Sequence, residues 1–92
     1  MKFEWDPSKA ASNLDKHGIS FHEAKTVFDN PLAAIFDDEA HSIGEIREII
    51  IGYSQSNQLL IISFTEHINS IRIISARLAT PQERQDYEQY RP

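Results

Sequence analysis

Residues 47–78 read REIIIGYSQSNQLLIISFTEHINSIRIISARL. They hold three strand-like segments joined by polar turns, and this pattern indicates the fold. Each segment is rich in β-branched and aromatic residues, which favour extended backbone. The connections SQSN (54–57) and HINS (67–70) are short, and Asn57 and Asn69 tolerate the positive φ that tight turns use. The stretch therefore predicts an antiparallel meander with strands at 47–54, 58–66 and 70–78.

The middle segment carries apolar residues at both parities of the strand, including Leu60, Ile61 and Phe64. A strand that is apolar on both sides is typically central in its sheet and covered on both faces. Upstream of the meander, AAIFDD (33–38) is typical of a shorter strand or edge segment, and KFEW (2–5) of a short first strand.

Helices are predicted between these first strands. Asp6 can cap the first helix and Pro7 fits its first turn, while Gly18 suits the left-handed residue that ends it. Lys16 and His17 then lie in the last turn, where positive charge suits the helix dipole. The apolar stripe expected to face the core is Ala10, Ala11 and Leu14.

The second helix begins at Ser20, which forms a capping box with Glu23, and ends at Asn30, because a residue before proline avoids helical angles. A third helix follows Thr80, with a further capping box to Glu83. Its apolar residues are only Tyr87 and Tyr90, so we expect weak packing along the sheet edge. The buried face of the second helix is expected to be Phe21, Ala24, Val27 and Phe28.

The element order is therefore β-α-α-β-β-β-β-α, an α+β fold in which an antiparallel meander packs against helices, in a single domain spanning residues 1–92. The absence of cysteine excludes disulfides and thiolate chemistry. The N-terminus lacks the apolar core of a secretory signal, and no apolar run is long enough to span a membrane. We expect a cytoplasmic protein with no membrane contact.

The formal net charge of −5 argues on average against a nucleic-acid binder, but all five arginines lie in residues 47–92. Since arginine can bind phosphate through two parallel hydrogen bonds, a phosphate site is expected in this half. Metal and nucleotide motifs are missing: the glycines are scattered, and no two histidines are four residues apart. We predict no metal and no cofactor. The histidines are His17, His22, His41 and His67.

The remaining candidates are Arg72, Arg77, His67 and Arg84, at or near the last strand. Metal-free RNA cleavage needs a base for the ribose 2′-hydroxyl, an acid for the leaving oxygen and cations for the charged phosphorane, and these residue types supply all three. Structural alternatives stay open. In a regular strand Arg72 and Arg77, about 16 Å apart, point to opposite faces unless a bulge or a strand ending intervenes near Ser75-Ala76. We therefore expect one of the two arginines to be structural, or the strand to break before Arg77.

The partner of Arg72 depends on the turn: a three-residue loop brings Glu66 opposite to it, and a loop of two or four residues brings Thr65. Arg77 and Arg84 can instead pair with Glu83 or Glu88 on the third helix. In each of these cases an ion pair accounts for the arginine without any chemistry.

From Phe3 to about Tyr87 the chain resembles the BrnT toxins of type II toxin–antitoxin modules. The resemblance rests on FEWDPSKAASNLDKHGISFHEAKTVFDNP, then IGYS and FTE, and on IRIISARLATPQERQDYE at the end. The residues matching the family's pattern are Trp5, Asp6, Lys9, Asn13, Lys16, His17, Gly18, Arg72, Ser75, Arg77, Thr80, Glu83, Arg84 and Tyr87.

The resemblance implies a RelE-like ribonuclease that cleaves RNA and inhibits translation. It also implies neutralisation by a BrnA-like ribbon-helix-helix antitoxin in a hetero-oligomer, which contacts operator DNA only through the antitoxin. We expect the catalytic residues to be Arg77, Arg72, His67 and His17, and the RNA-binding residues to be Lys16, Thr80 and Arg84.

The chain departs from the family at three basic positions. His67 follows Glu66 where the family usually has arginine, Asn57-Gln58 stands where Gly-Arg is frequent, and Pro81-Gln82 replaces basic residues. Each lost phosphate contact weakens RNA binding. Two hypotheses follow: an active ribonuclease in which His67 titrates as acid or base, or a catalytically weak member that acts as an antitoxin-binding or co-repressor module.

Overall fold

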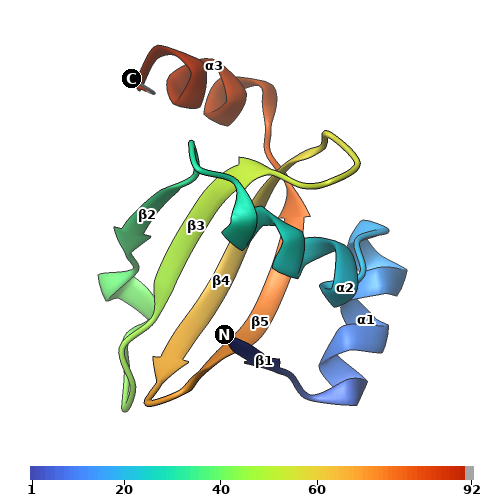
Figure 1. Cartoon of the computed structure of the whole chain (residues 1–92), viewed down its shortest axis with the longest axis vertical. Helices are drawn as coiled ribbons and strands as arrows, with labels where there is room; N and C mark the ends of the chain where they lie inside the picture. The colour runs from blue at the N-terminus through green and yellow to red at the C-terminus, as the bar shows by residue number, and fades with distance from the viewer. Residues whose placement is uncertain (91–92) are drawn as a thin grey trace.

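The structure, a computed structural model, describes residues 1–90, so Arg91, one of the five arginines counted above, lies outside the described residues. Its centre is a five-stranded sheet in the order β1-β5-β4-β3-β2 (Figure 1). Strands β3 to β5 form the predicted antiparallel meander, β2 extends it with a further antiparallel strand at the edge, and β1 joins the sheet parallel to β5. The strands are β1 (Lys2–Glu4), β2 (Ala34–Asp37), β3 (Glu48–Tyr53), β4 (Leu59–His67) and β5 (Ser70–Leu78).

Helix α1 (Pro7–His17) begins and ends as predicted. The Asp6 carboxylate accepts a hydrogen bond from the backbone N–H of Ser8 at 2.8 Å, and Gly18 follows the helix with a φ of 69°. A positive φ costs glycine little, because it has no Cβ to clash with the backbone. Because the helix ends at His17, Lys16 lies in its last turn, beside the last backbone carbonyls of the helix, where a cation is favoured.

The buried residue of α1 is Asn13, and the predicted apolar stripe is wrong at Leu14, which is 52% exposed. Strand β1 pairs only with residues 70–72, so the edge of β5 beyond that point has no neighbouring strand. The Asn13 side chain takes that place: its amide donates to the carbonyls of Ala76 and Ile19 at 2.8 and 2.9 Å, and its oxygen accepts from the Ala76 N–H at 3.0 Å. A hydrogen-bonding side chain is needed here because buried backbone groups must be paired.

The second helical segment is α2 (Phe21–Ala24) followed by a 3₁₀ turn, η1 (Lys25–Asp29), so the prediction of one continuous helix is wrong. Ser20 caps α2 as predicted, accepting the Glu23 N–H at 3.0 Å. The Thr26 hydroxyl donates to the Glu23 carbonyl at 2.7 Å. A hydroxyl that binds a backbone carbonyl in this way competes with the backbone hydrogen bonds of an α-helix, which favours the tighter 3₁₀ turn.

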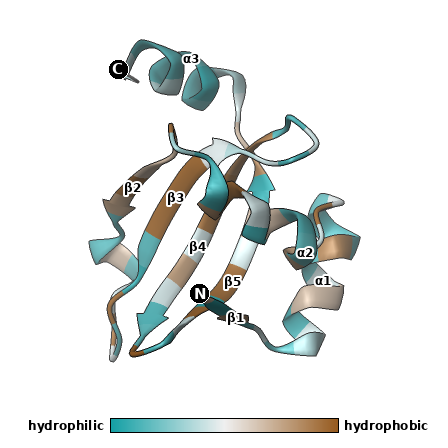
Figure 2. Ribbon diagram, viewed as in Figure 1, coloured by the Kyte–Doolittle hydropathy of each residue, from teal (hydrophilic) through white to brown (hydrophobic). Residues whose placement is uncertain are grey.

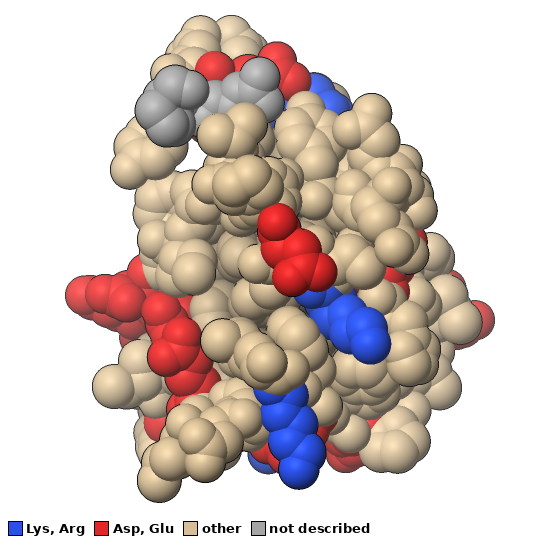
Figure 3. Space-filling model, viewed as in Figure 1, with Lys and Arg blue, Asp and Glu red and all other residues tan. Residues whose placement is uncertain are grey.

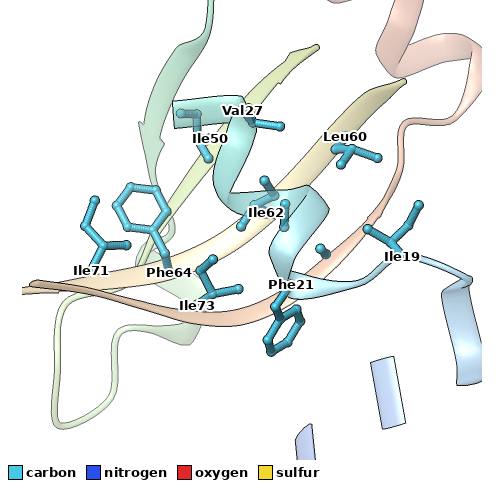
Figure 4. Packing of buried hydrophobic residues seen from close by; sticks show 11 residues of the cluster. Ile19, Phe21, Val27, Ile50, Leu60, Ile62, Phe64, Ile71 and Ile73 are labelled. Carbon is cyan, nitrogen blue, oxygen red and sulfur yellow. The ribbon is translucent and has the colours of Figure 1, made fainter. Parts of the chain in front are cut away.

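The main core lies between the sheet and the α2–η1 segment. Figure 4 shows Phe21 and Val27 from the helical side packed against Ile62, Phe64 and Ile73 from the strands, and each of these residues is at most 1% exposed. Figure 2 shows hydrophobic colour along the middle of β3 and on parts of β4 and β5, beneath that segment. The predicted buried face of the second helix is confirmed for Phe21, Ala24 and Val27, and Phe28 is half-buried.

Helix α3 (Pro81–Tyr90) lies at one end of the sheet (Figure 1) and is anchored by a single buried residue, Tyr87. Tyr87 packs against Ile51 and Leu59, and its hydroxyl donates to the Leu32 carbonyl at 2.6 Å. The strand register turns Ile51 and Leu59 away from the main core, so α3 packs on the opposite face rather than along the edge. At this end β4 is covered on both faces, as predicted. We call the sheet surface opposite α2 and η1 the open face.

Candidate functional site

A bulge in β5 decides which way its arginines point. Ser63 of β4 pairs with Ser75, whereas the next residue, Phe64, pairs with Ile73, so Ile74 is the extra residue. An inserted residue of this kind reverses the alternation of the strand beyond it. Two residues on either side of Ile74 that would point to opposite faces of a regular strand therefore point to the same face.

The bulge thereby places Arg72 and Arg77 together on the open face. Arg72 pairs with Thr65 and Arg77 with Ile61, and these partners are an even number of residues apart on the regular strand β4. The two arginines are about 13 Å apart along the sheet, which is the rise of four strand residues. Of the predicted alternatives, the structure has the bulge, and β5 continues through it without a break.

Arg72 and His67 are neighbours on the open face. The turn between β4 and β5 has two residues, so Arg72 faces Thr65 and the alternative with Glu66 opposite it is excluded. His67, which pairs with Ser70, is the diagonal neighbour of Arg72, with Cβ atoms about 7–8 Å apart. Both side chains are exposed, and within residues 1–90 Arg72 makes no hydrogen bond or ion pair. They can therefore both reach one bound phosphate.

Arg77 is held by Glu83 of α3. Two parallel hydrogen bonds of 2.8 and 3.0 Å join the guanidinium to the carboxylate. The Arg77 hydrogen bonds, together with those from Thr80, lower the pKa of Glu83 to about 2, against the opposing effect of partial burial. The same pair raises the pKa of Arg77. The predicted structural alternative for Arg77 is thus present, although its side chain is 41% exposed and stays accessible from the open face.

This ion pair predicts acid sensitivity. The pKa of Glu83 is about 2 in the folded chain against 4.5 as its ordinary value, so its stabilisation is complete above pH 4.5 and is lost as pH falls toward 2. Since the pair is partly exposed, we expect about 1 kcal/mol, or about 4–8 °C in Tm. Thermal melts should show Glu83→Gln less stable than wild type at pH 6 and nearly equal at pH 2.5; a constant difference at both pH values would contradict the prediction.

A second cluster of polar side chains lies where α1 meets the bulged edge of β5. A pocket of about 200 Å³ is lined there by Lys9, Ser12, Asn13, Lys16, His17, Ile74 and Ser75. Lys9, Lys16 and His17 are exposed, and Ser75 is on the open face by its pairing with Ser63. The predicted residues Lys16 and His17 therefore stand beside the open face, at its β5 edge, with Lys9 as a further cation.

Thr80 and Arg84 lie apart from this cluster and are engaged in holding α3. The Thr80 hydroxyl accepts the Glu83 N–H at 3.1 Å, while the Thr80 N–H donates to the Glu83 carboxylate at 2.9 Å, completing the predicted capping box. Arg84 donates to the Tyr53 hydroxyl at 3.3 Å and makes no ion pair with Glu88, to which Tyr53 itself donates.

Sequence reasoning missed Arg47. Its carbonyl accepts the Asp38 N–H at 2.9 Å and so continues the pairing of β2 with β3. Strand alternation then puts the Arg47 side chain on the open face, next to Thr65 and in line with Arg72. Its Nε is buried without a hydrogen bond and lies 3.9 Å from Glu45. The sequence could have indicated this position, because Arg47 is two residues from the strand residue Ile49 and alternation puts both on the same face.

Among the described residues, no group of three or more histidine, aspartate or glutamate side chains could hold a metal ion. No helix in residues 1–90 combines the length and the apolar character that a membrane crossing requires.

Comparison with known proteins identifies the family. The sequence profile described as "Ribonuclease toxin, BrnT, of type II toxin-antitoxin system" matches residues 5–83. This chain belongs to the BrnT family. The crystal structure of the Brucella abortus ribonuclease toxin BrnT, at 1.1 Å resolution, is similar with a TM-score of 0.69 and 25% sequence identity, over 87% of this chain and 97% of that chain. No curated protein sequence gives a significant match.

Membership of the BrnT family gives the class, a ribonuclease toxin of a type II toxin–antitoxin system, and confirms the expected α+β fold. The matched span contains every predicted site residue except Arg84. In this BrnT chain the structure brings together Arg72, Arg77 and His67 on the open face, with Lys16 and His17 at its edge.

Proposed function

We propose that this BrnT-family chain is a metal-independent endoribonuclease that cuts RNA, inhibits translation and acts in the cytoplasm as a single toxin domain spanning residues 1–92. The observation that supports it best is the Arg72 guanidinium, which has no partner within residues 1–90 and lies beside the imidazole of His67 on an exposed sheet face. A cation with free donors next to an imidazole, whose ring nitrogens can accept or donate a proton, suits a phosphodiester substrate.

The proposed reaction is attack of a ribose 2′-hydroxyl on the adjacent phosphorus, with departure of the 5′-oxygen. His67 takes the proton of the attacking 2′-hydroxyl and then gives it to the departing 5′-oxygen, and Arg72 stabilises the extra negative charge on the phosphorane oxygens. His17 is the second candidate for proton transfer, since it stands at the β5 edge of the same face. Arg77 is placed to contact a neighbouring phosphate, because it is about 13 Å from Arg72 and held by Glu83.

RNA binding away from the reacting phosphate is assigned to Lys16, with Lys9 and Arg47 added by the structure. Thr80 and Arg84 are retained as contacts of lower importance, since hydrogen bonds to Glu83 and Tyr53 already occupy them. No residue of this set needs a metal or cofactor to act.

The proposed partner is a BrnA-like antitoxin with a ribbon-helix-helix part, because toxins of type II systems are neutralised by a protein. Ribbon-helix-helix proteins are dimers, so the complex is a hetero-oligomer. Contact with operator DNA comes only through the antitoxin, which agrees with the net charge of −5 on this chain.

One observation favours a second function, that of an antitoxin-binding or co-repressor module with little cleavage. Both oxygens of Glu83 are bound to Arg77, so one of the expected catalytic cations is partly neutralised. The chain also lacks basic residues at His67, Asn57-Gln58 and Pro81-Gln82. In this reading the sheet face serves binding alone.

A cleavage assay separates the two functions. Antitoxin-free protein is incubated in EDTA with a fluorogenic RNA, and with the same RNA carrying a 2′-O-methyl group at every ribose. We expect cleavage of the first and none of the second, because the proposed nucleophile is the 2′-hydroxyl. Cleavage that stops in EDTA refutes metal independence, and an RNA left intact under all conditions supports the binding module.

A further inference from the structure

The open face has a second feature, an apolar groove between α3 and strands β2, β3 and β4. Its cavity measures about 310 Å³. We call it the α3 groove; it is lined by Phe36, Ile49, Ile51, Ile61, Tyr87 and Tyr90, together with Glu83 and Asp86. None of these apolar residues has a part in the proposed cleavage.

The mouth of the α3 groove is formed by two exposed aromatic rings. Phe36 of β2 is 45% exposed and Tyr90 of α3 is 68% exposed, and their ring centroids are 5.9 Å apart. Large apolar side chains gathered in one exposed place usually mark an interaction site. Strand β2 is also the outer strand of the sheet, so its free edge adjoins the groove.

The charge on the α3 groove selects between possible occupants. Its two charged lining residues, Glu83 and Asp86, are both carboxylates, and no lysine or arginine of residues 1–90 lines it. Within residues 1–90 the Asp86 carboxylate is bound to one group, the neutral Gln82 amide, which donates to it at 3.0 Å. Figure 3, which shows the other side of the sheet, has acidic side chains gathered beside β2, so that edge is acidic too. These carboxylates repel a phosphate backbone and attract a basic protein segment.

We propose that the α3 groove is the docking surface for the antitoxin, and that the antitoxin segment seated in it carries apolar side chains flanked by lysine or arginine. This inference rests on the proposed function, since it takes the antitoxin to be the partner. The open face is then divided into a basic part along β5 and α1 for RNA, and an apolar, acidic part under α3 for the antitoxin.

The boundary between the two parts is the Arg77–Glu83 ion pair, because Glu83 lines the groove while it binds Arg77. A segment seated in the groove therefore lies directly beside an RNA-facing arginine. Occupancy of the groove is expected to inhibit cleavage by obstructing RNA, so that increasing RNA concentration opposes the inhibition.

The test uses the full chain and the antitoxin encoded by the reading frame adjacent to its gene, with binding measured by calorimetry. Phe36→Glu and Asp86→Arg change exposed groove residues, and each is expected to weaken binding at least about tenfold. The matched control is Ile35→Glu: Ile35 is 53% exposed on the same strand but pairs with Ile50, so it points to the other face. Asp15→Arg on α1 is the charge control. Both controls should bind within about twofold of wild type.

Circular dichroism melts establish that each variant is folded. Two independent groove variants are used so that the test still holds if one of them does not fold. Wild-type affinity in both groove variants overturns the inference, as does absence of binding by the wild type. A groove variant that changes RNA cleavage or the oligomeric state of the free chain, with antitoxin affinity intact, also overturns it, because RNA or a second copy is then the occupant. Loss of binding in groove variants of a chain that cleaves no RNA supports the inference and refutes only the proposed nuclease.

Discussion

Replacing Arg72 with alanine is expected to reduce RNA cleavage at least about 100-fold, because in the proposed reaction Arg72 is the main electrostatic contact to the developing phosphorane charge. The melting temperature should stay close to that of wild type, since the Arg72 guanidinium makes no hydrogen bond or ion pair within residues 1–90. Initial rates with the fluorogenic RNA, combined with thermal melts, measure the two effects separately.

The matched control for this prediction is Lys25→Ala. Lys25 is an exposed cation on η1, on the side of the sheet away from Arg72, so its loss changes net charge equally without touching the open face. Arg72→Lys should fall between wild type and Arg72→Ala, because lysine keeps the charge but loses the two-donor fork. Equal rates for wild type and Arg72→Ala would show that Arg72 is not catalytic.

Replacing Asn13 with leucine is expected to destabilise the fold by about 3 kcal/mol or more. The substitution leaves three backbone groups without their partner, namely the N–H and carbonyl of Ala76 and the carbonyl of Ile19. Each buried polar group left unpaired costs about 1–3 kcal/mol. For a chain of this size the Tm should fall by about 12 °C or more.

The control for Asn13 is its neighbour on α1. Ser12 is exposed and lines the same pocket, so Ser12→Ala should change stability by no more than about 0.5 kcal/mol. Urea denaturation of both variants at pH 7 measures the difference. If Asn13→Leu is as stable as wild type, the Asn13 side chain is not needed to close the edge of β5.

The strands were predictable because two local signals agree in each of them. Alternating β-branched residues mark the segments 47–54, 58–66 and 70–78, and polar turns separate them; Asn57 indeed has a φ of 61°. Capping chemistry located the helix ends in the same way, since Asp6, Gly18 and Thr80 each make the local hydrogen bonds or adopt the backbone angle expected of them.

The errors came from contacts that no local pattern encodes. Asn13 is polar, and its burial depends on the edge of β5 that lies far along the chain. The place of the bulge is hidden because Ile73 and Ile74 are both apolar, so either residue could face the core. The 3₁₀ turn at η1 depends on one side-chain hydrogen bond from Thr26.

The candidate site was half predictable for the same reason. The residue types followed from the arginine distribution and the family resemblance, but their grouping depends on register. A single inserted residue, Ile74, puts Arg72 and Arg77 on the same face, and the length of the β4–β5 turn puts His67 beside Arg72. The pairing of Arg77 with Glu83 was among the alternatives, and the structure selects it.

The parallel pairing of β1 with β5 has a consequence for the order of folding. Phe3 is synthesised early but pairs with Ile71, so β1 can join the edge of the sheet only after most of the chain has been synthesised. Contacts between such distant segments form slowly, because the intervening chain must be ordered first. A nascent chain that has emerged only as far as β4 therefore lacks Arg72 and the strand that positions it. On the proposed function, RNA cleavage then requires a chain that is complete through β5, so activity arises late in synthesis and an antitoxin already present can bind the toxin as it is completed.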